Sequence, residues 1–257
     1  MTLFDLTNKT AIVTGSTKGI GRATANRLAQ HGANVVISSR KLSACSQVAE
    51  DVNRNWVTGG ARAIPIPCNI NHKEQLRSLV DRTLDTFGDI DILVCNAAVN
   101  PYFGPSADIS DEAFNRTIET NVRSNFWLCN MVISEMDNIK GGSITIISSI
   151  GGLRGRPLIG AYGISKAADM QIARNLATEY GPKNIRANCI APGLIRTDFA
   201  RALWENEKIL SERTASTPLR RIGEPDEVAG AVVFLASDAG AFITGETLVI
   251  DGGVTVV

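Results

Sequence analysis

Short runs of apolar residues alternate along this chain with longer amphipathic segments. The runs are rich in valine and isoleucine and lack regular polar alternation, so we interpret them as strands buried on both faces. The predicted strands span residues 10–14, 34–38, 63–68, 91–95, 143–148, 185–191 and 247–251. Apolar residues at helical spacing predict helices over residues 19–31, 42–57, 73–87, 111–136, 161–180 and 225–237. This order predicts an α/β fold with a seven-stranded, doubly wound parallel sheet and helices on both faces.

Length and composition indicate one large domain. The chain has 257 residues, of which 44% are hydrophobic, and no repeat or linker interrupts the pattern, so we predict a single domain over residues 1–257. The net charge of zero gives no indication of nucleic acid or an anionic membrane as a partner. The longest apolar run, residues 228–236, is too short to cross a bilayer, and the first residues do not resemble a signal peptide. We therefore expect a soluble, cytoplasmic protein without nucleic-acid or membrane partners.

Metal chemistry and a Ser-His-Asp triad are both disfavoured by the sequence. The two histidines, His31 and His72, have no metal-ligand spacing and no triad context. The cysteines are odd in number, form no C-x-x-C pair and are expected to be reduced and buried: Cys45, Cys68, Cys95, Cys129 and Cys189. We expect no metal site.

A glycine-rich segment joins the first predicted strand to the first predicted helix, with the spacing G-x-x-x-G-x-G. Such a turn lets a pyrophosphate approach the backbone and rest at the helix N-terminus, although glycines also simply form turns. We predict a dinucleotide site here, and with it a single-domain Rossmann fold. The loop would contribute Gly15, Ser16, Thr17, Lys18, Gly19, Ile20 and Gly21.

The first βαβ unit is basic although the whole chain is neutral. No Asp or Glu occurs from residue 6 to residue 49, whereas six Lys or Arg residues do. NAD-binding folds usually place an acid at the end of the second strand, but here that end reads Ser38-Ser39-Arg40-Lys41. Arg40 could pair with a 2′-phosphate, with Ser39 beside it and Lys18 approaching from the glycine loop. We predict NADP(H) as the cofactor, against the alternative of a solvated basic surface.

Tyr162 and Lys166 lie four residues apart at the start of a predicted helix, so the phenol and the ammonium share one helix face. A free phenol titrates near about 10, and making it a useful acid/base at neutral pH requires about 4 kcal/mol. One cation about 4 Å away supplies an interaction of that order at an effective dielectric constant of about 20. Taken alone, the pair also fits an ordinary surface helix, and the dinucleotide loop makes the chemical interpretation preferable.

These motifs together resemble the short-chain dehydrogenase/reductase family over essentially the whole chain, in the branch of NADP(H)-preferring carbonyl reductases and 3-oxoacyl reductases. The matching segments are Thr14-Gly15-x-x-x-Gly19-x-Gly21, Asn96-Ala97-Ala98, Asn121, Ser149, Tyr162-x-x-x-Lys166 and Pro192-Gly193-Leu194-Ile195-Arg196-Thr197. Two positions depart from the family pattern, because Ala98 replaces a usual glycine and Asn69 replaces a frequent acid.

The resemblance implies a role for each motif residue. Tyr162 would be the acid/base, Lys166 would support it and hold the nicotinamide ribose, and Ser149 rather than Ser148 would bind the reacting oxygen. Asn121 would anchor a proton-relaying water, although it also fits a helix residue satisfied by backbone. The cofactor would further meet Asn69, Ile70, Asn96, Ala97, Pro192, Gly193, Ile195 and Thr197.

The expected activity is hydride transfer between NADPH and a carbonyl or secondary alcohol of a small-molecule substrate. Residues 198–218 would form an amphipathic lid, and residues 100–103 would add an aromatic wall opposite. Arg154 and Arg156 would either face an anionic tail of the substrate or form loop or subunit salt bridges. The alternatives are a non-catalytic NADP(H)-binding redox sensor, a 3-oxoacyl thioester reductase of the fatty-acid type and, less well supported, an epimerase or dehydratase.

The two long helices over residues 111–136 and 161–180 predict an assembly. Their apolar positions exceed what the sheet requires, and family members commonly pair these helices. The positions are Phe126, Leu128, Met131, Ile164, Ile172 and Leu176. We predict a homotetramer through these two helices.

Overall fold

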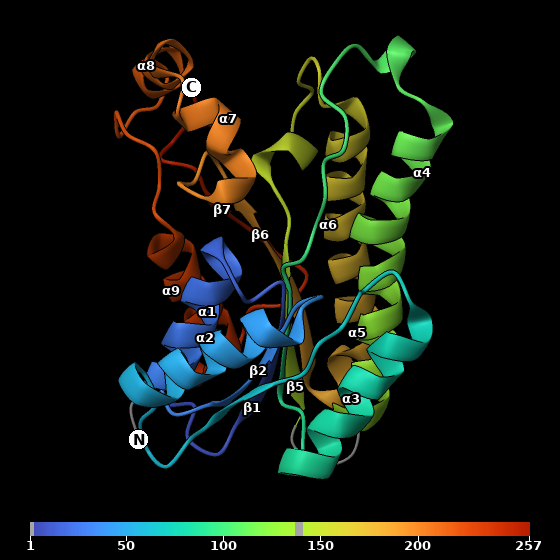
Figure 1. Ribbon diagram of the computed structural model, residues 1–257, viewed down its shortest axis with the longest axis vertical. Helices are drawn as coiled ribbons and strands as arrows, with labels where there is room; N and C mark the ends of the chain where they lie inside the picture. The colour runs from blue at the N-terminus through green and yellow to red at the C-terminus, as the bar shows by residue number, and fades with distance from the viewer. Residues whose placement is uncertain (1–2, 137–140) are drawn as a thin grey trace.

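The computed structural model describes residues 3–136 and 141–257 and has three layers, a central parallel sheet with helices on each face (Figure 1). The described strands form one seven-stranded sheet in the order β3-β2-β1-β4-β5-β6-β7, and every pairing is parallel. The strands are β1 (Thr10–Thr14), β2 (Asn34–Ser38), β3 (Ala63–Pro65), β4 (Ile92–Cys95), β5 (Gly142–Ile147), β6 (Ile185–Pro192) and β7 (Thr247–Ile250). The predicted α/β fold is confirmed, although β3 ends earlier than expected.

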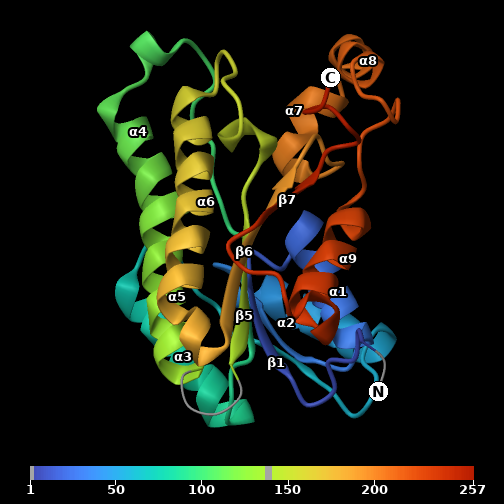
Figure 2. The same cartoon turned by 180° about the vertical axis from the view of Figure 1, so that it is seen from behind.

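The helices divide between the two faces of the sheet, as Figures 1 and 2 show from opposite sides. One face carries α1 (Gly19–Gln30), α2 (Leu42–Asn55) and α9 (Pro225–Ala236), and the other carries α3 (Lys73–Phe87), α5 (Ser124–Met136) and α6 (Gly160–Tyr180). Alternate residues of each strand point into two separate apolar clusters, for example Val13 on one side and Ile12 on the other. Strands β1, β2, β4, β5 and β6 are therefore buried on both faces, as predicted. The prediction is wrong for the two edge strands, because β3 is only partly buried and Leu248 and Val249 of β7 are 37% and 38% exposed.

The predicted helix over residues 111–136 is interrupted at its centre. It comprises α4 (Asp111–Ile118), a π-helical turn over Glu119–Arg123, and α5. The Ser124 hydroxyl donates to the carbonyl oxygen of Thr120 (2.5 Å), and the Asn125 amide donates to that of Asn121 (2.7 Å). These side chains compete for the carbonyls of the helical ladder, which accounts for the wider turn. Single π turns inside α-helices are frequent at functional sites.

The chain reverses its direction across the sheet between β1 and β4. The first strands proceed from β1 to β2 and β3, and the chain then returns to place β4 on the other side of β1. In open parallel sheets, ligands bind outside the carboxyl ends of the strands at such a switch point. Figure 1 shows that α7 (Arg201–Trp204) and α8 (Glu207–Ala215) project beyond this end of the sheet.

The expected surplus of apolar positions on the two long helices is only partly present. Leu128, Met131 and Leu176 are buried in the core, because both helices need these residues to cover the sheet. Phe126 and Ile164 remain on the surface, with 53% and 56% of their area exposed. None of the described helices combines the length and the apolar character needed to cross a membrane. All five cysteines are buried and free.

Candidate active site

The glycine loop is held against the fourth strand by hydrogen bonds of Asn96 and Thr14. The Asn96 amide nitrogen donates to the carbonyl oxygens of Thr14 (2.9 Å) and Gly15 (3.3 Å), and the Thr14 hydroxyl accepts from the N–H groups of Asn96 (3.0 Å) and Ala97 (3.1 Å). Gly15 has a φ of 65°, which favours glycine. A Cβ atom at Gly21 would lie only 2.4 Å from the Asn96 amide nitrogen. Glycine at these positions therefore permits the close approach of loop and strand.

The N-terminus of α1 follows this loop and offers free backbone donors. Lys18, which precedes the helix, makes no side-chain cap, and the described first turn carries no acidic residue. The first N–H groups of a helix lack intrahelical partners, and the helix dipole adds positive potential there. Gly19 and Ile20 at this end line a large cavity. The donors and the open cradle fit the diphosphate of a dinucleotide.

The end of β2 presents a cation to the same cavity. Ser39 and Arg40 both line it, and Arg40 is exposed, with no ion-pair partner in the described parts of the chain. Lys18 was expected to approach the 2′-phosphate together with Arg40, but its Nζ pairs with the Asp198 carboxylate at 3.1 Å. Both side chains of this pair are exposed, so water and salt screen their attraction. Arg40 is thus the unpaired charge at this end.

The cavity has a volume of about 1880 Å³ and gathers most of the predicted site residues. That volume exceeds the roughly 300–1,000 Å³ of a typical single-ligand pocket. The predicted residues on its wall are Gly15, Lys18, Gly19, Ile20, Ser39, Arg40, Asn69, Ile70, Asn96, Ala97, Ser149, Tyr162, Lys166, Pro192, Gly193, Ile195 and Thr197. It thus has room for a dinucleotide and a second small molecule.

Four predicted site residues do not reach this wall: Ser16, Thr17, Gly21 and Asn121. The Ser16 side chain is fully buried, where its hydroxyl donates to the Val13 carbonyl oxygen and accepts from the Ser38 N–H, both at 2.8 Å. Ser16 therefore ties β1 to β2. Gly21 packs behind the loop against Asn96.

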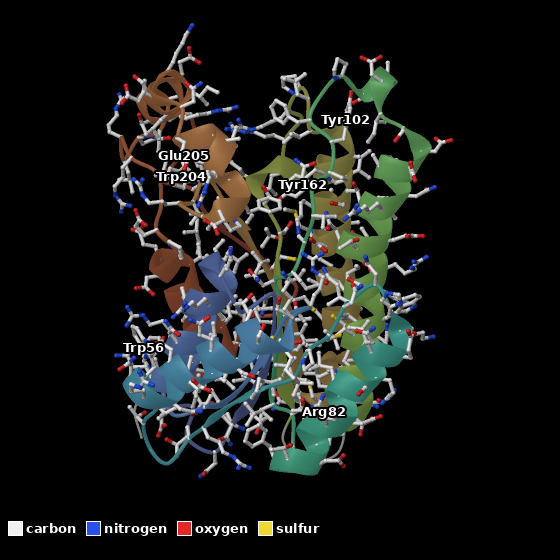
Figure 3. All side chains as sticks on the ribbon, in the orientation of Figure 1. Trp56, Arg82, Tyr102, Tyr162, Trp204 and Glu205 are labelled. Atoms are coloured by element: carbon white, nitrogen blue, oxygen red, sulfur yellow. The ribbon has the colours of Figure 1, made fainter. Side chains whose placement is uncertain are left out.

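Tyr162 and Ser149 reach the cavity from neighbouring segments. Tyr162 stands on the first turn of α6 and projects toward α7 (Figure 3), where its ring centre lies 6.1 Å from that of Phe199. The Ser149 hydroxyl accepts from the Gly151 N–H at 3.0 Å, which leaves its own hydrogen for a ligand oxygen. The Ser148 hydroxyl instead donates to the Lys166 carbonyl oxygen at 2.7 Å. The two adjacent serines thus have different tasks, as their positions on extended chain predict.

Lys166 lies beneath Tyr162 in a buried ion pair that the sequence analysis did not anticipate. Its Nζ is 5.7 Å from the centre of the Tyr162 ring and donates to the Ile147 carbonyl oxygen and to Asp169 Oδ2, both at 2.9 Å. The side chains of Lys166 and Asp169 are 2% and 0% exposed. This ion pair fixes the ammonium between the end of β5 and the phenol.

Two polar contacts between neighbouring helices support this arrangement. The Asn121 amide nitrogen donates to the Ser165 hydroxyl at 3.0 Å, and the Asn125 amide nitrogen donates to Asp169 Oδ1 at 3.1 Å. Asn121 also exchanges two hydrogen bonds with the backbone of Val99, at 2.8 and 2.9 Å. The two asparagines are four residues apart, and so are Ser165 and Asp169. The two contacts therefore lie one helical turn apart and join α6 to the segment formed by the π turn and α5.

Electrostatics keeps Lys166 protonated. Burial lowers the pKa of Lys166, but attraction to Asp169 and to Tyr162, together with the hydrogen bond to Asp169, outweighs burial and raises it overall. Burial raises the pKa of Asp169, while Lys166 and Asn125 act in the opposite direction and do not fully cancel it. The ammonium is consequently charged at neutral pH.

The predicted lid forms the opposite wall of the cavity. It consists of a 3-10 turn over Asp198–Ala200 followed by α7 and α8, coloured orange in Figure 1. Phe199, Leu203 and Ile209 line the cavity, whereas Trp204 anchors the lid, because its Nε1 donates to the Thr197 carbonyl oxygen at 2.8 Å. Leu210 does not line the cavity.

The expected aromatic wall over residues 100–103 is reduced to one ring. Phe103 lines the cavity, whereas the Tyr102 hydroxyl donates to the Pro105 carbonyl oxygen at 2.9 Å within its own loop. Among residues 3–136 and 141–257, no group of three potential metal-ligating side chains was found.

Asp169 and Asn125 are the site residues that sequence reasoning missed. Asp169 follows Lys166 by three residues, a spacing that places both on one helix face and could have indicated the ion pair. Asn125 follows Asn121 by four residues and therefore shares its face. Neither spacing identifies the partner helix.

We predict that Asp169→Asn lowers the free energy of unfolding by about 3 kcal/mol, because it leaves the Lys166 ammonium buried without a counter-ion. The double variant Lys166→Met, Asp169→Leu should recover part of that loss, since neither buried charge remains. Urea denaturation followed by tryptophan fluorescence measures both effects. Asp85→Asn on the exposed surface of α3 is the matched control and should be near wild type. Equal stability of Asp169→Asn and the wild type would contradict the prediction.

Comparison with known proteins places these motifs in one family. Residues 15–255 match a family model described as enoyl-(acyl carrier protein) reductase. The chain is 42% identical over 248 residues to dehydrogenase/reductase SDR family member 4 of Homo sapiens, covering 96% of this chain and 88% of that protein. Among solved structures it resembles a gluconate 5-dehydrogenase from Burkholderia cenocepacia J2315 in complex with NADP and tartrate (TM-score 0.94, 30% identity, 99% and 98% of the two chains).

A 7α-hydroxysteroid dehydrogenase complexed with NADH and 7-oxo glycochenodeoxycholic acid is equally similar in fold (TM-score 0.92, 35% identity, 98% and 96% of the two chains). These similarities extend over nearly the whole chain. The chain thus belongs to the short-chain dehydrogenase/reductase family of oxidoreductases, which act on alcohol and carbonyl groups.

Proposed function

We propose that this protein is an NADPH-dependent carbonyl reductase, able in principle to oxidise the corresponding secondary alcohol. The observation that carries the proposal is that Tyr162 and Ser149 line the same cavity as the glycine loop and Arg40. A phenol and a hydroxyl are thereby available to one ligand oxygen within reach of a dinucleotide site. Such donors are what a carbonyl oxygen needs when hydride reaches its carbon and negative charge develops on it.

In the proposed mechanism, bound NADPH supplies the hydride, and the protein supplies orientation and a proton. Ser149 donates a hydrogen bond to the carbonyl oxygen, and Tyr162 gives that oxygen its proton. The buried Lys166 ammonium offsets the charge left on the phenol. Asp169 and Ile147 keep this ammonium in place. Asn121 is hydrogen-bonded to Val99 and Ser165, which fixes the π turn beside α6. We propose that the protons lost by Tyr162 are replaced by a relay that passes Asn121.

The NADP(H) preference rests on Arg40. This guanidinium is unpaired among the described residues and stands where an NAD-binding site usually has an acid. Its planar fork suits a phosphate monoester. The solved relatives contain NADP in one case and NADH in another, so they leave the choice open.

Removal of the phenol tests the activity. We expect wild-type protein to oxidise NADPH in the presence of a panel of ketones, aldehydes and 3-oxoacyl thioesters. Tyr162→Phe should lower kcat by a factor of about 10² to 10⁴, the usual contribution of a general acid. The measurement is absorbance at 340 nm. Tyr180→Phe changes the last residue of the same helix and serves as the matched control.

Two other outcomes would redirect the assignment. Tight NADPH binding without turnover on a broad panel would favour the non-catalytic redox sensor. A strong preference for thioesters would favour the 3-oxoacyl reductase, which the acyl-carrier description of the family model also makes worth testing.

Arg40→Gln should weaken NADPH binding about tenfold or more and leave NADH binding nearly unchanged, because only NADPH carries the phosphate. Fluorescence titration with each nucleotide gives the two dissociation constants. Arg54→Gln removes the same charge from the exposed surface of α2 and should affect neither. Equal weakening of both nucleotides by Arg40→Gln would refute the role of this residue in cofactor choice.

We further propose a cytoplasmic homotetramer that pairs the helices α4, α5 and α6 with those of neighbouring subunits. The support is that the exposed Phe126 and Ile164 lie on these helices. Multi-angle light scattering should give four times the mass of one chain, and Phe126→Asp should reduce it. A wild-type monomer would refute the assembly.

A further inference from the structure

Two arginines that the proposed mechanism does not use line the same cavity as Tyr162. Arg156 is half-buried in the segment between β5 and α6, and Arg213 is on α8 of the lid. In Figure 1 the yellow-green segment after β5 and the orange helices α7 and α8 lie at the same end of the molecule. The two cations therefore belong to separate structural elements that border one space.

Neither guanidinium has an ion-pair partner or a side-chain hydrogen bond within residues 3–136 and 141–257. Three other arginines near the lid do contact a carboxylate. The pairs are Arg196 with Glu224 (2.9 Å), Arg201 with Asp198 (2.9 Å) and Arg221 with Glu227 (2.6 Å). On the cavity wall Arg221 is thus neutralised, whereas Arg156 and Arg213 have no ion pair among the described residues, as Arg40 has none at the other end.

The charges around Arg156 make it a receptor for an anion. Burial lowers the pKa of Arg156, and the positive charges of Arg154 and Arg213 lower it further. A partly desolvated guanidinium beside two like charges is costly, and an oxyanion placed between them would remove that cost. Guanidinium groups also bind carboxylates and phosphates in forked, charge-assisted geometry.

Four carboxylates line the cavity, and three of them are engaged elsewhere. Asp198 pairs with Lys18, and Glu119 pairs with Arg123 at 3.2 Å. The Asp251 carboxylate accepts from the N–H groups of residues 253 and 255 at 2.8 and 2.7 Å. Glu112, in the first turn of α4, forms no ion pair with either arginine among the described residues. Within residues 3–136 and 141–257, no carboxylate thus forms an ion pair with Arg156.

Apolar side chains from the lid and from other segments line the same cavity as the phenol and these cations. They are Phe103, Leu158, Phe199, Leu203 and Ile209. Such a wall favours a ligand with an apolar body, and burying that body removes apolar area from water.

We propose that Arg156 and Arg213 bind an oxyanion of the substrate, a carboxylate or a phosphate, while its carbonyl group lies at Tyr162 and Ser149. The substrate class is therefore an amphiphilic ketone, or the corresponding alcohol, with an anionic end. This inference rests on the proposed reductase function for the carbonyl end, whereas the anion site itself can be tested by binding alone.

Matched substrates that differ only in charge test the proposal. We would compare kcat/KM for 4-oxo-4-phenylbutanoate and for its methyl ester with NADPH, in the wild type, Arg156→Gln and Arg213→Gln. The acid should exceed the ester by about tenfold or more in the wild type, and this ratio should fall about tenfold in each variant. Arg82→Gln is the matched control, because Arg82 lies at the opposite end of the molecule (Figure 3). An ester equal to the acid, or a ratio unchanged in both variants, would overturn the proposal while leaving the reductase function intact.

A binding measurement separates the two proposals. Benzoate and phenyl phosphate would be titrated by calorimetry into the NADPH-loaded wild type and into Arg156→Gln. Weaker binding of either anion to the variant supports the site, and the more strongly bound one identifies the oxyanion. Unchanged binding of both, or binding of neither to the wild type, refutes it. If no ketone is turned over but an anion binds through Arg156, the reductase function fails and the anion site stands.

Discussion

The buried ion pair between Lys166 and Asp169 is the interaction on which the candidate site depends. A lysine side chain is long and flexible, and fixing it costs about 2 kcal/mol of rotamer entropy. Here the Ile147 carbonyl oxygen and Asp169 each hold the ammonium at 2.9 Å. Buried ion pairs often contribute little net stability, because desolvation offsets their attraction. The gain is positional, since the charge remains within 5.7 Å of the centre of the Tyr162 ring.

The same ion pair explains why the helix before it is irregular. Asp169 needs a second donor, and Asn125 supplies it from α5 at 3.1 Å. Asn121, one turn earlier, reaches Ser165 in the same way. Both asparagines must face α6, and the Asn125 amide nitrogen also donates a hydrogen bond to the backbone carbonyl oxygen of Asn121. A π turn at Glu119–Arg123 accommodates these demands. The defect in the helix thus follows from satisfying polar groups at a buried interface.

What the sequence could predict is what depends on local pattern. Strands buried on both faces require uninterrupted runs of valine and isoleucine, so their positions were predicted to within a few residues, and β3 was the exception. The glycine loop was recognisable because Gly15 and Gly21 have a local conformational and steric reason to be glycine. Ser16 belongs to the same motif, yet its hydroxyl bonds to Val13 and Ser38. Motif membership alone did not distinguish a residue that lines the cavity from one that supports it.

What the sequence could not predict depends on which elements meet. An Asp three residues after a Lys is common on helices, and only the packing of α5 on α6 makes Asp169 a buried counter-ion. Leu128 and Leu176 were predicted to contribute to a subunit interface, but both are buried in the core against the sheet. Arg156 and Arg213 lie far from Arg40 in the sequence, yet all three line one cavity. In a chain whose net charge is zero, unpaired cations on a cavity wall are informative, because the nearby Arg196, Arg201 and Arg221 are neutralised by carboxylates. Because these three cations line the cavity, we propose that a ligand supplies their partner.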